Sequence, residues 1–169
     1  GAVAAAAAAA AKEAAAAAAA KEEAAALARL PKAERLRRRA VAEVLSTERS
    51  YVADLTTLAE EVMLPLSCHL SARDLRRVFS NALAVQRLNK RLLQMLEAEF
   101  AAAGGAAKAR VGKVLFEFAP FLKIYLTFVG AFDGAQAHLE QLARGDPKVA
   151  AAVARCAASP RCRGLNVGS

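Results

Sequence analysis

The chain has 169 residues, the length of one ordinary domain and enough to bury a hydrophobic core. Its 24 lysines and arginines outnumber its 16 aspartates and glutamates, and the resulting net charge of +8 favours acidic partners. Seven phenylalanines, two tyrosines and no tryptophan offer few aromatic rings for stacking on bases, so we expect no nucleic-acid partner.

Residues 1–32 are an alanine-rich, low-complexity leader, and residues 33–169 form the domain that we expect to carry the function. Alanine has the highest helix propensity, so the leader is expected to be helical without burying anything. It lacks the basic start and leucine-rich centre of a signal peptide, and alanine is too weakly apolar for membrane insertion. We therefore expect a cytoplasmic protein, with a membrane-peripheral location left open.

Amphipathic helices follow the leader. The first is expected to end at Pro65, the second to begin after Ser71 as its N-cap, and the third to bend at Pro120. The glycine pair at 104–105 indicates a loop between the second and third helices, and no segment alternates with the period of a strand. The sequence thus predicts an all-α fold, an elongated bundle of long helices. The expected helices cover residues 34–64, 72–100, 108–144 and 147–158.

Glu48 is out of place in the first of these helices. At about 100° per residue, the apolar side chains of the segment form one stripe, and Glu48 lies near its middle. An unpaired carboxylate there costs several kcal/mol if it is buried. Two explanations are open. One is an ion pair with an arginine of a neighbouring helix, which is how buried charges are usually satisfied; the other is a surface kept for a partner protein.

Four stretches resemble, in order, segments of the Dbl homology domain, the family of exchange factors for Rho-type GTPases. The first, VLSTERSYVADL at residues 44–55, keeps the family's T-E-x-x-Y-V-x-D-L core but not its acidic opening residue. The others are VFSNALAVQRLNKRLL at 78–93, VGKVLFEFAPFLKIY at 111–125 and CRGL at 162–165. One such match would be weak, whereas four in the right order are specific.

This resemblance implies a guanine-nucleotide exchange factor module, which binds a Rho-family small GTPase in its nucleotide-free or GDP-bound form and promotes GDP release. It implies no covalent chemistry and no cofactor. Glu48 would contact the first switch loop of the GTPase and accept charge-assisted hydrogen bonds from it. Val44 and Tyr51, each about one turn away, would flank that contact, although packing within the bundle is the alternative for both.

The resemblance spans about residues 35–167, roughly the first two-thirds of a Dbl homology domain. The family's third signature, an L-x-x-P-x-Q-R-x-x-R-Y helix, would begin within a few residues of Val167, and neither it nor a pleckstrin homology domain is among these residues. In the family the GTPase surface combines the first segment, the third signature and a final helix, so this chain carries one wall of it. A non-catalytic helical scaffold that keeps the bundle is the alternative function.

Arginines cluster at the starts of the first two helices, where the positive end of the helix dipole disfavours them. We expect them to pair with acids elsewhere, to form a solvated face, or to meet an anionic membrane surface. They are Arg35, Arg37, Arg38 and Arg39 in the first helix and Arg73, Arg76 and Arg77 in the second.

The remaining polar residues are expected to be structural. The three cysteines lack metal-ligand spacing and are expected to be buried free thiols, so we expect no metal site. Asn89 lies on an apolar stripe, where a core amide with its hydrogen bonds satisfied is expected. His69 and His138 have no carboxylate at useful spacing, so we expect solvent-exposed or loop histidines.

Overall fold

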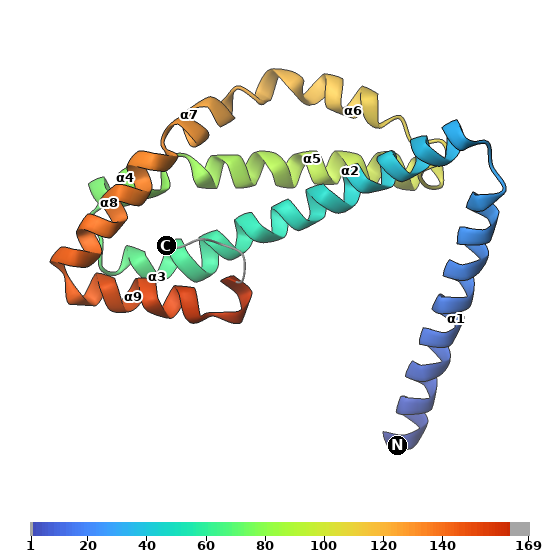
Figure 1. Cartoon of the computed structure of the whole chain (residues 1–169), viewed down its shortest axis with the longest axis horizontal. Helices are drawn as coiled ribbons and strands as arrows, with labels where there is room; N and C mark the ends of the chain where they lie inside the picture. The colour runs from blue at the N-terminus through green and yellow to red at the C-terminus, as the bar shows by residue number, and fades with distance from the viewer. Residues whose placement is uncertain (1, 163–169) are drawn as a thin grey trace. The chain divides into compact units, whose positions relative to one another are not determined.

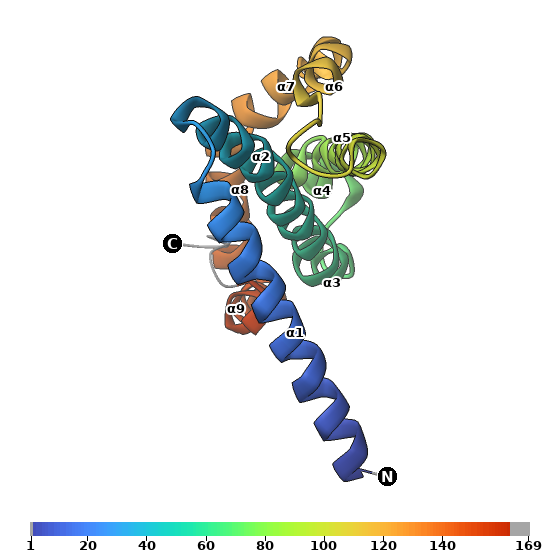
Figure 2. The ribbon, with the colours of Figure 1, turned by 90° about the vertical axis from the view of Figure 1, so that its right-hand side faces the viewer.

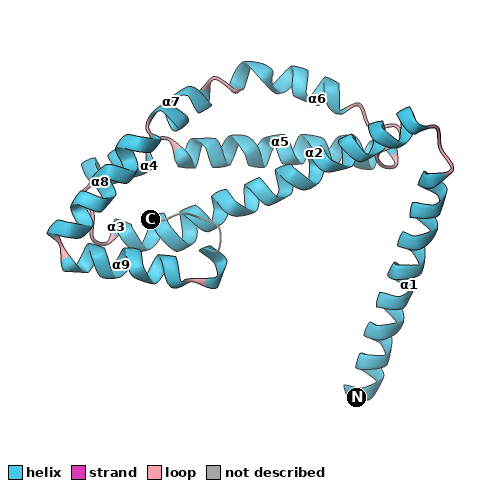
Figure 3. Cartoon of the chain, in the orientation of Figure 1, coloured by secondary structure: helices cyan, strands magenta, loops and turns pink. Residues whose placement is uncertain are grey.

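The computed structural model describes residues 2–162, and within them every regular element is a helix (Figure 3). This confirms the expected all-α class. The chain divides into two compact units, Gly1–Ala42 and Glu43–Ser169, each of which is described by itself. Helix α2, Lys32–Thr57, contributes its first residues to one unit and the rest to the other.

The first unit holds α1, Ala2–Ala28, a helix whose side chains are almost all exposed, as its alanine content predicts. Arg35 closes the turn after α1, because its Nη1 donates to the carbonyl oxygens of Ala28 (3.0 Å) and Leu30 (3.3 Å). Arg37 and Arg38 both pair with Glu34, at 3.1 and 2.7 Å, and lower its pKa to about 2. An acid in the first turn therefore neutralises two of the arginines that the helix dipole disfavours.

Within the second unit, α2 continues through a π-helical turn, η1 (Leu58–Met63), into the short helix α3 (Leu64–Ser67). The prediction that Pro65 ends the helix is wrong. Pro65 lies in the first turn of α3, where a missing N–H does little harm. The Glu61 carbonyl, four residues before Pro65, instead accepts a hydrogen bond from Cys156 Sγ at 3.0 Å.

The predicted helix over 72–100 is two helices, α4 (Ala72–Phe79) and α5 (Ala82–Ala103). The break falls at Ser80, whose φ of +47° no helix accommodates. Ser71 is the N-cap of α4, as predicted: its Oγ accepts from the Asp74 backbone N–H at 3.1 Å. Helix α5 runs three residues further than expected and ends at Ala103, where its C-cap Gly104 adopts the left-handed conformation at φ +67°.

The predicted helix over 108–144 is also divided. It consists of α6 (Val111–Phe118), a 3₁₀ turn η2 (Ala119–Phe121), α7 (Ile124–Gly130) and α8 (Phe132–Gly145), so Pro120 breaks the helix and does not merely bend it. Helices α6 and α7 pack along α5 (Figures 1 and 2). Helix α9, Pro147–Ala158, has the predicted bounds, and the 3₁₀ turn η3, Pro160–Cys162, follows it.

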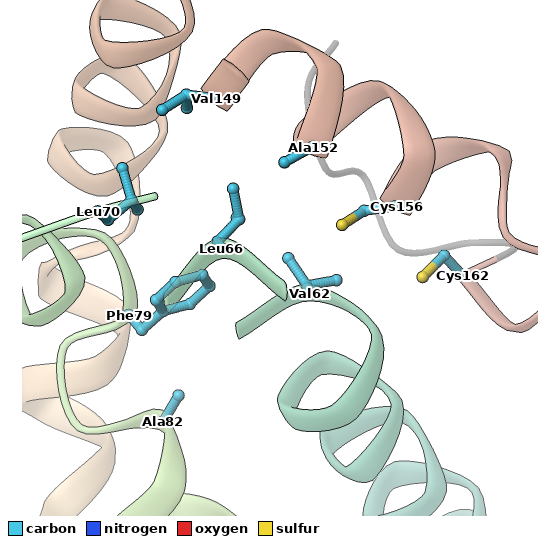
Figure 4. Close-up of a cluster of buried hydrophobic side chains, with 9 residues drawn as sticks. All are labelled: Val62, Leu66, Leu70, Phe79, Ala82, Val149, Ala152, Cys156 and Cys162. Atoms are coloured by element: carbon cyan, nitrogen blue, oxygen red, sulfur yellow. The ribbon is translucent and has the colours of Figure 1, made fainter. Parts of the chain in front are cut away.

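The core of the second unit lies where η1 and α3 meet α4, α5 and α9 (Figure 4). Val62 and Leu66 are almost fully buried, and side chains of α9 cover them. The cysteine prediction holds for two residues of three, because Cys156 and Cys162 are buried free thiols while Cys68 is exposed. The buried hydrophobic cluster comprises Val62, Leu66, Leu70, Phe79, Ala82, Val149, Ala152, Cys156 and Cys162.

The prediction for His138 is wrong, since this residue is buried and bonded to a carboxylate. Its Nε2 lies 2.8 Å from Asp74 Oδ1, which ties α8 to the start of α4. The Ser71 hydroxyl and His138 together hold the pKa of Asp74 below its usual value. Sequence spacing could not reveal this pair, because the two residues are 64 positions apart. His69 is exposed, as expected.

Leu66→Ala should reduce the free energy of unfolding by about 3 kcal/mol, because it removes a fully buried leucine and leaves a cavity. Urea denaturation followed by circular dichroism measures this loss. Leu64→Ala is the matched control two residues away: its side chain is 66% exposed, so it should change stability by less than about 0.5 kcal/mol. Equal effects of the two substitutions would contradict this description of the core.

Candidate functional site

Glu48 lies in the part of α2 that belongs to the second unit, and its side chain is half-buried. Its Oε1 is buried and has no hydrogen-bond partner among the described residues. Burial raises the pKa of this carboxyl above its usual value. No ion pair of Glu48 exists within residues 2–162, so the interpretation as an internal ion pair is wrong.

The local sequence explains why no arginine reaches Glu48. Leu45 and Val52, on the same stripe of α2, are buried and fix the rotation of the helix. That rotation turns the neighbouring Arg49 away, toward α5, where its Nε pairs with Glu97 Oε1 at 2.9 Å. Glu48 is therefore held at the edge of the packed face, with one carboxylate oxygen, Oε1, that no described residue satisfies.

Tyr51, one turn beyond Glu48, is half-buried and belongs to a polar network that joins three helices. Burial raises the pKa of its hydroxyl, and so do a hydrogen bond with Tyr125 of α7 and the charge of Glu48. The Tyr125 hydroxyl in turn donates to Asn89 Oδ1 of α5 at 2.9 Å. Asn89 Nδ2 donates to the Val85 carbonyl oxygen at 2.8 Å. The prediction that Asn89 is a satisfied core amide is confirmed.

A second polar contact, which sequence reasoning missed, fastens α5 to α2 close to this network. Gln86 is buried, and its Nε2 donates to Thr56 Oγ1 at 3.1 Å and to the Leu55 carbonyl oxygen at 3.5 Å. A buried amide satisfied from a neighbouring helix fixes the register of that helix. The only available signal was a glutamine at an inward-facing position of α5.

An apolar groove of about 670 Å³ begins beside Tyr51. It lies between η1 and α4 on one side and α8 and α9 on the other. Its edge carries Asp54 and the Glu140–Arg144 ion pair, whose atoms are 3.3 Å apart. We call it the Tyr51 groove; its apolar lining includes Leu55, Leu58, Val78, Phe128, Phe132 and Leu139.

Large apolar side chains are also exposed along α6 and α7. Phe116 is 81% exposed and Leu126 is 78% exposed, values far above those of ordinary core residues. Large apolar side chains exposed along consecutive helices are typical of a contact surface. Its members are Leu115, Phe116, Phe121, Leu122, Leu126, Val129 and, at the start of α8, Phe132.

Val44, Glu48 and Tyr51 thus follow one another at one-turn intervals along α2, all half-buried, and Tyr51 borders the Tyr51 groove. Chemically, this arrangement can accept hydrogen bonds through the Glu48 carboxylate and can bury apolar side chains beside it. Within residues 2–162 there is no group of three side chains able to hold a metal ion.

In a comparison with known protein families, residues 40–169 match the family described as the RhoGEF domain. The chain belongs to the RhoGEF-domain family. The match includes all of the motif residues discussed above, of which Val44, Glu48, Tyr51, Asn89 and Tyr125 lie in the described part of the domain. The CRGL stretch at 162–165 lies, except for Cys162, outside the described residues.

Curated relatives share about a quarter of their residues with this RhoGEF domain. "Rac guanine nucleotide exchange factor JJ" of Dictyostelium discoideum is 26% identical over 120 residues, which are 66% of this chain and 10% of that protein. Intersectin-1 of Xenopus laevis is 27% identical over 143 residues, 83% of this chain and 8% of that protein. The chain therefore spans a tenth or less of the length of these relatives.

Solved structures of RhoGEF domains share the fold. The DH/PH domains of p115-RhoGEF superimpose with a TM-score of 0.68 at 23% identity, covering 83% of this chain and 40% of that chain. A structure of the Vav1 exchange factor also gives 0.68, at 21% identity, covering 79% of this chain and 35% of that chain. At such identities the likeness establishes the helical bundle, while the contact roles of Val44, Glu48 and Tyr51 stay predictions.

Glu48→Gln should stabilise the domain at neutral pH by on the order of 1 kcal/mol, because it removes a buried, unsatisfied charge. A raised pKa means that the folded state binds the proton more tightly than the unfolded state does. The cost of the charge therefore grows as the pH rises above the ordinary glutamate pKa, and the gain from glutamine should vanish near about pH 4.

Thermal denaturation of both proteins across this pH range measures the effect. Glu97→Gln is the control, since it removes a carboxylate from an exposed ion pair with Arg49 and should change stability by less than about 1 kcal/mol, as a loss. A Glu48→Gln protein that is less stable than the parent at pH 7 would mean that the Glu48 carboxylate has a partner after all.

Proposed function

We propose that this domain binds a Rho-family small GTPase and promotes the release of GDP from it. The single observation that carries the proposal is the Glu48 carboxylate, half-buried in the first family motif and without a partner within the described residues. Tolerating such a group costs folding stability, which is expected where a side chain is reserved for a ligand. We assign the role to residues 33–169 and none to the leader at 1–32.

The proposed mechanism needs only hydrogen bonds. The Glu48 carboxylate accepts charge-assisted hydrogen bonds from backbone N–H and hydroxyl groups of the first switch loop, and Val44 and Tyr51 pack on either side of it. A switch loop held in this way no longer grips the nucleotide and its Mg²⁺. The domain then binds nucleotide-free GTPase more tightly than loaded GTPase, and by linkage it lowers the affinity for GDP. The exchange factor undergoes no covalent step.

We propose that the second wall of the site lies in the Tyr51 groove. The groove is apolar, open and adjacent to Tyr51, so it suits an amphipathic helix of the family's third-signature type. Such a helix would lie beside the Val44–Glu48–Tyr51 row and extend the contact surface. We propose that full exchange activity requires this helix to be seated in the groove.

A cytoplasmic site of action, in part at a membrane surface, also belongs to this proposal. No helix in the described part of the chain is long and apolar enough to cross a bilayer. Arg37 and Arg38 are engaged by Glu34, so attraction to anionic lipid in the first unit would rest on its other exposed cations, Lys12, Lys21, Arg29, Lys32 and Arg39.

Release of a fluorescent GDP analogue from a panel of Rho-type GTPases tests the function. The domain should accelerate release, and Glu48→Ala should reduce the acceleration by about 10-fold or more, the equivalent of losing one or two charge-assisted hydrogen bonds. Glu43→Ala is the matched control: this exposed glutamate lies on another face of the same helix and should leave exchange unchanged.

Two results would contradict the proposal. Equal losses in Glu48→Ala and Glu43→Ala would remove Glu48 from the contact. A folded domain that neither accelerates release nor binds nucleotide-free GTPase would favour the non-catalytic scaffold. Binding without acceleration would instead indicate that exchange requires a helix seated in the Tyr51 groove. Glu48→Gln is expected to be at least as stable as the parent, so a loss of exchange in that variant is not explained by unfolding.

A further inference from the structure

A second groove, separate from the Tyr51 groove, lies among η1, α3, α4 and α5. It measures about 600 Å³, and the two grooves share only Phe79 and Ser80 in their linings. Its walls include Met63, Leu64 and Leu83. We call it the basic groove, because Arg76 and Arg87 line it. The proposed exchange mechanism does not use this groove, although its α5 wall lies within the second family stretch, residues 78–93.

Two leucines of the basic groove are exposed although the helices around it are well packed. Leu64 is 66% exposed and Leu83 is 44% exposed, whereas Leu66, two residues after Leu64, and Ala82, next to Leu83, are buried in the core. Since the core is filled by these neighbours, the two exposed leucines contribute nothing to it. They form an apolar strip along a concave surface, the arrangement that accepts apolar side chains of a partner.

The edge of the groove is positively charged. Arg76 of α4 and Arg87 of α5 both line it, both are exposed, and neither forms an ion pair within the described part of the chain. The one acid in the lining, Glu60, pairs with Arg161 at 2.9 Å, and Arg161 also pairs with Glu61 at 2.6 Å. Exposed Arg73 and Arg77 extend the positive charge along α4. The groove therefore favours an anionic ligand.

The floor of the groove is held in a fixed, strained conformation. Ser80 has a φ of +47°, which a non-glycine residue adopts only when its surroundings impose it. The following residue, Asn81, anchors the turn, since its Nδ2 donates to the Ile124 carbonyl oxygen of α7 at 3.0 Å. A groove with such a floor is formed before any ligand binds, which lowers the entropic cost of binding.

We propose that the basic groove binds an acidic amphipathic helix of a protein partner. Leucine-type side chains one turn apart on that helix would fill the strip formed by Leu64 and Leu83, and flanking carboxylates would pair with Arg76 and Arg87. A membrane surface fits less well, because the exposed leucines line a concave surface rather than a convex one. The site is independent of Glu48 and of nucleotide exchange.

Fluorescence anisotropy with a labelled synthetic helix of about 16 residues, with leucine at i, i+3, i+4 and i+7 and glutamate elsewhere on its surface, tests the proposal. The full chain should bind this peptide, and the same peptide with lysine replacing glutamate should not bind. Arg76→Glu with Arg87→Glu should weaken binding at least 10-fold, as should Leu64→Ser with Leu83→Ser. All four side chains are exposed, so the variants should keep the parent's circular dichroism spectrum and melting temperature.

Lys90→Glu with Arg91→Glu is the matched control, because these exposed cations lie on α5 outside the groove and the net charge changes equally. If the control weakens peptide binding as much as the groove variant does, the attraction is general and the proposal is wrong. It is also wrong if the parent does not bind the acidic peptide. The proposal is also contradicted if Arg76→Glu with Arg87→Glu reduces co-sedimentation with phosphatidylserine vesicles but leaves peptide binding unchanged.

Discussion

The unbroken helical run from Glu43 to Ser67 supports everything else in the second unit. At one end Val62 and Leu66 form the centre of the core, where α4 and α9 pack on them. At the other end Leu45 and Val52 fix the rotation of α2 and so place Glu48 at the edge of the packed face. The π turn η1 carries the run past Pro65, and Cys156 of α9 bonds to the backbone of this turn. The stability of the second unit and the position of Glu48 therefore depend on the same continuous helical segment.

The candidate site combines a rigid support with one unsatisfied group. Tyr51, Tyr125 and Asn89 form a polar network across α2, α7 and α5, so motif residues that are distant in sequence support each other in space. Beside this network Glu48 Oε1 has no hydrogen-bond partner among the described residues. A group held in place by satisfied neighbours, yet itself unsatisfied, is pre-organised for a partner's donors.

The sequence revealed the helical class, the outlying glutamate and the family, because helical periodicity and ordered motifs are local signals. It did not reveal the break at Ser80, where no glycine or proline stands, because tertiary contacts such as that of Asn81 with α7 impose that turn. It also misplaced the end of the first helix, since a π turn absorbs Pro65. The His138–Asp74 bond and the Gln86 contact depend on packing between helices, which no spacing within one helix encodes.

The central claim is that Glu48 is kept unsatisfied in the free domain so that a GTPase can satisfy it. Carbon-13 NMR titration of the Glu48 carboxyl, assigned by comparison with Glu48→Gln, tests this claim directly. The pKa of this carboxyl should be raised in the free domain and should fall when nucleotide-free Rho-type GTPase binds, because donated hydrogen bonds favour the charged form. An ordinary pKa in the free domain, or a raised pKa that does not change in the complex, would contradict it.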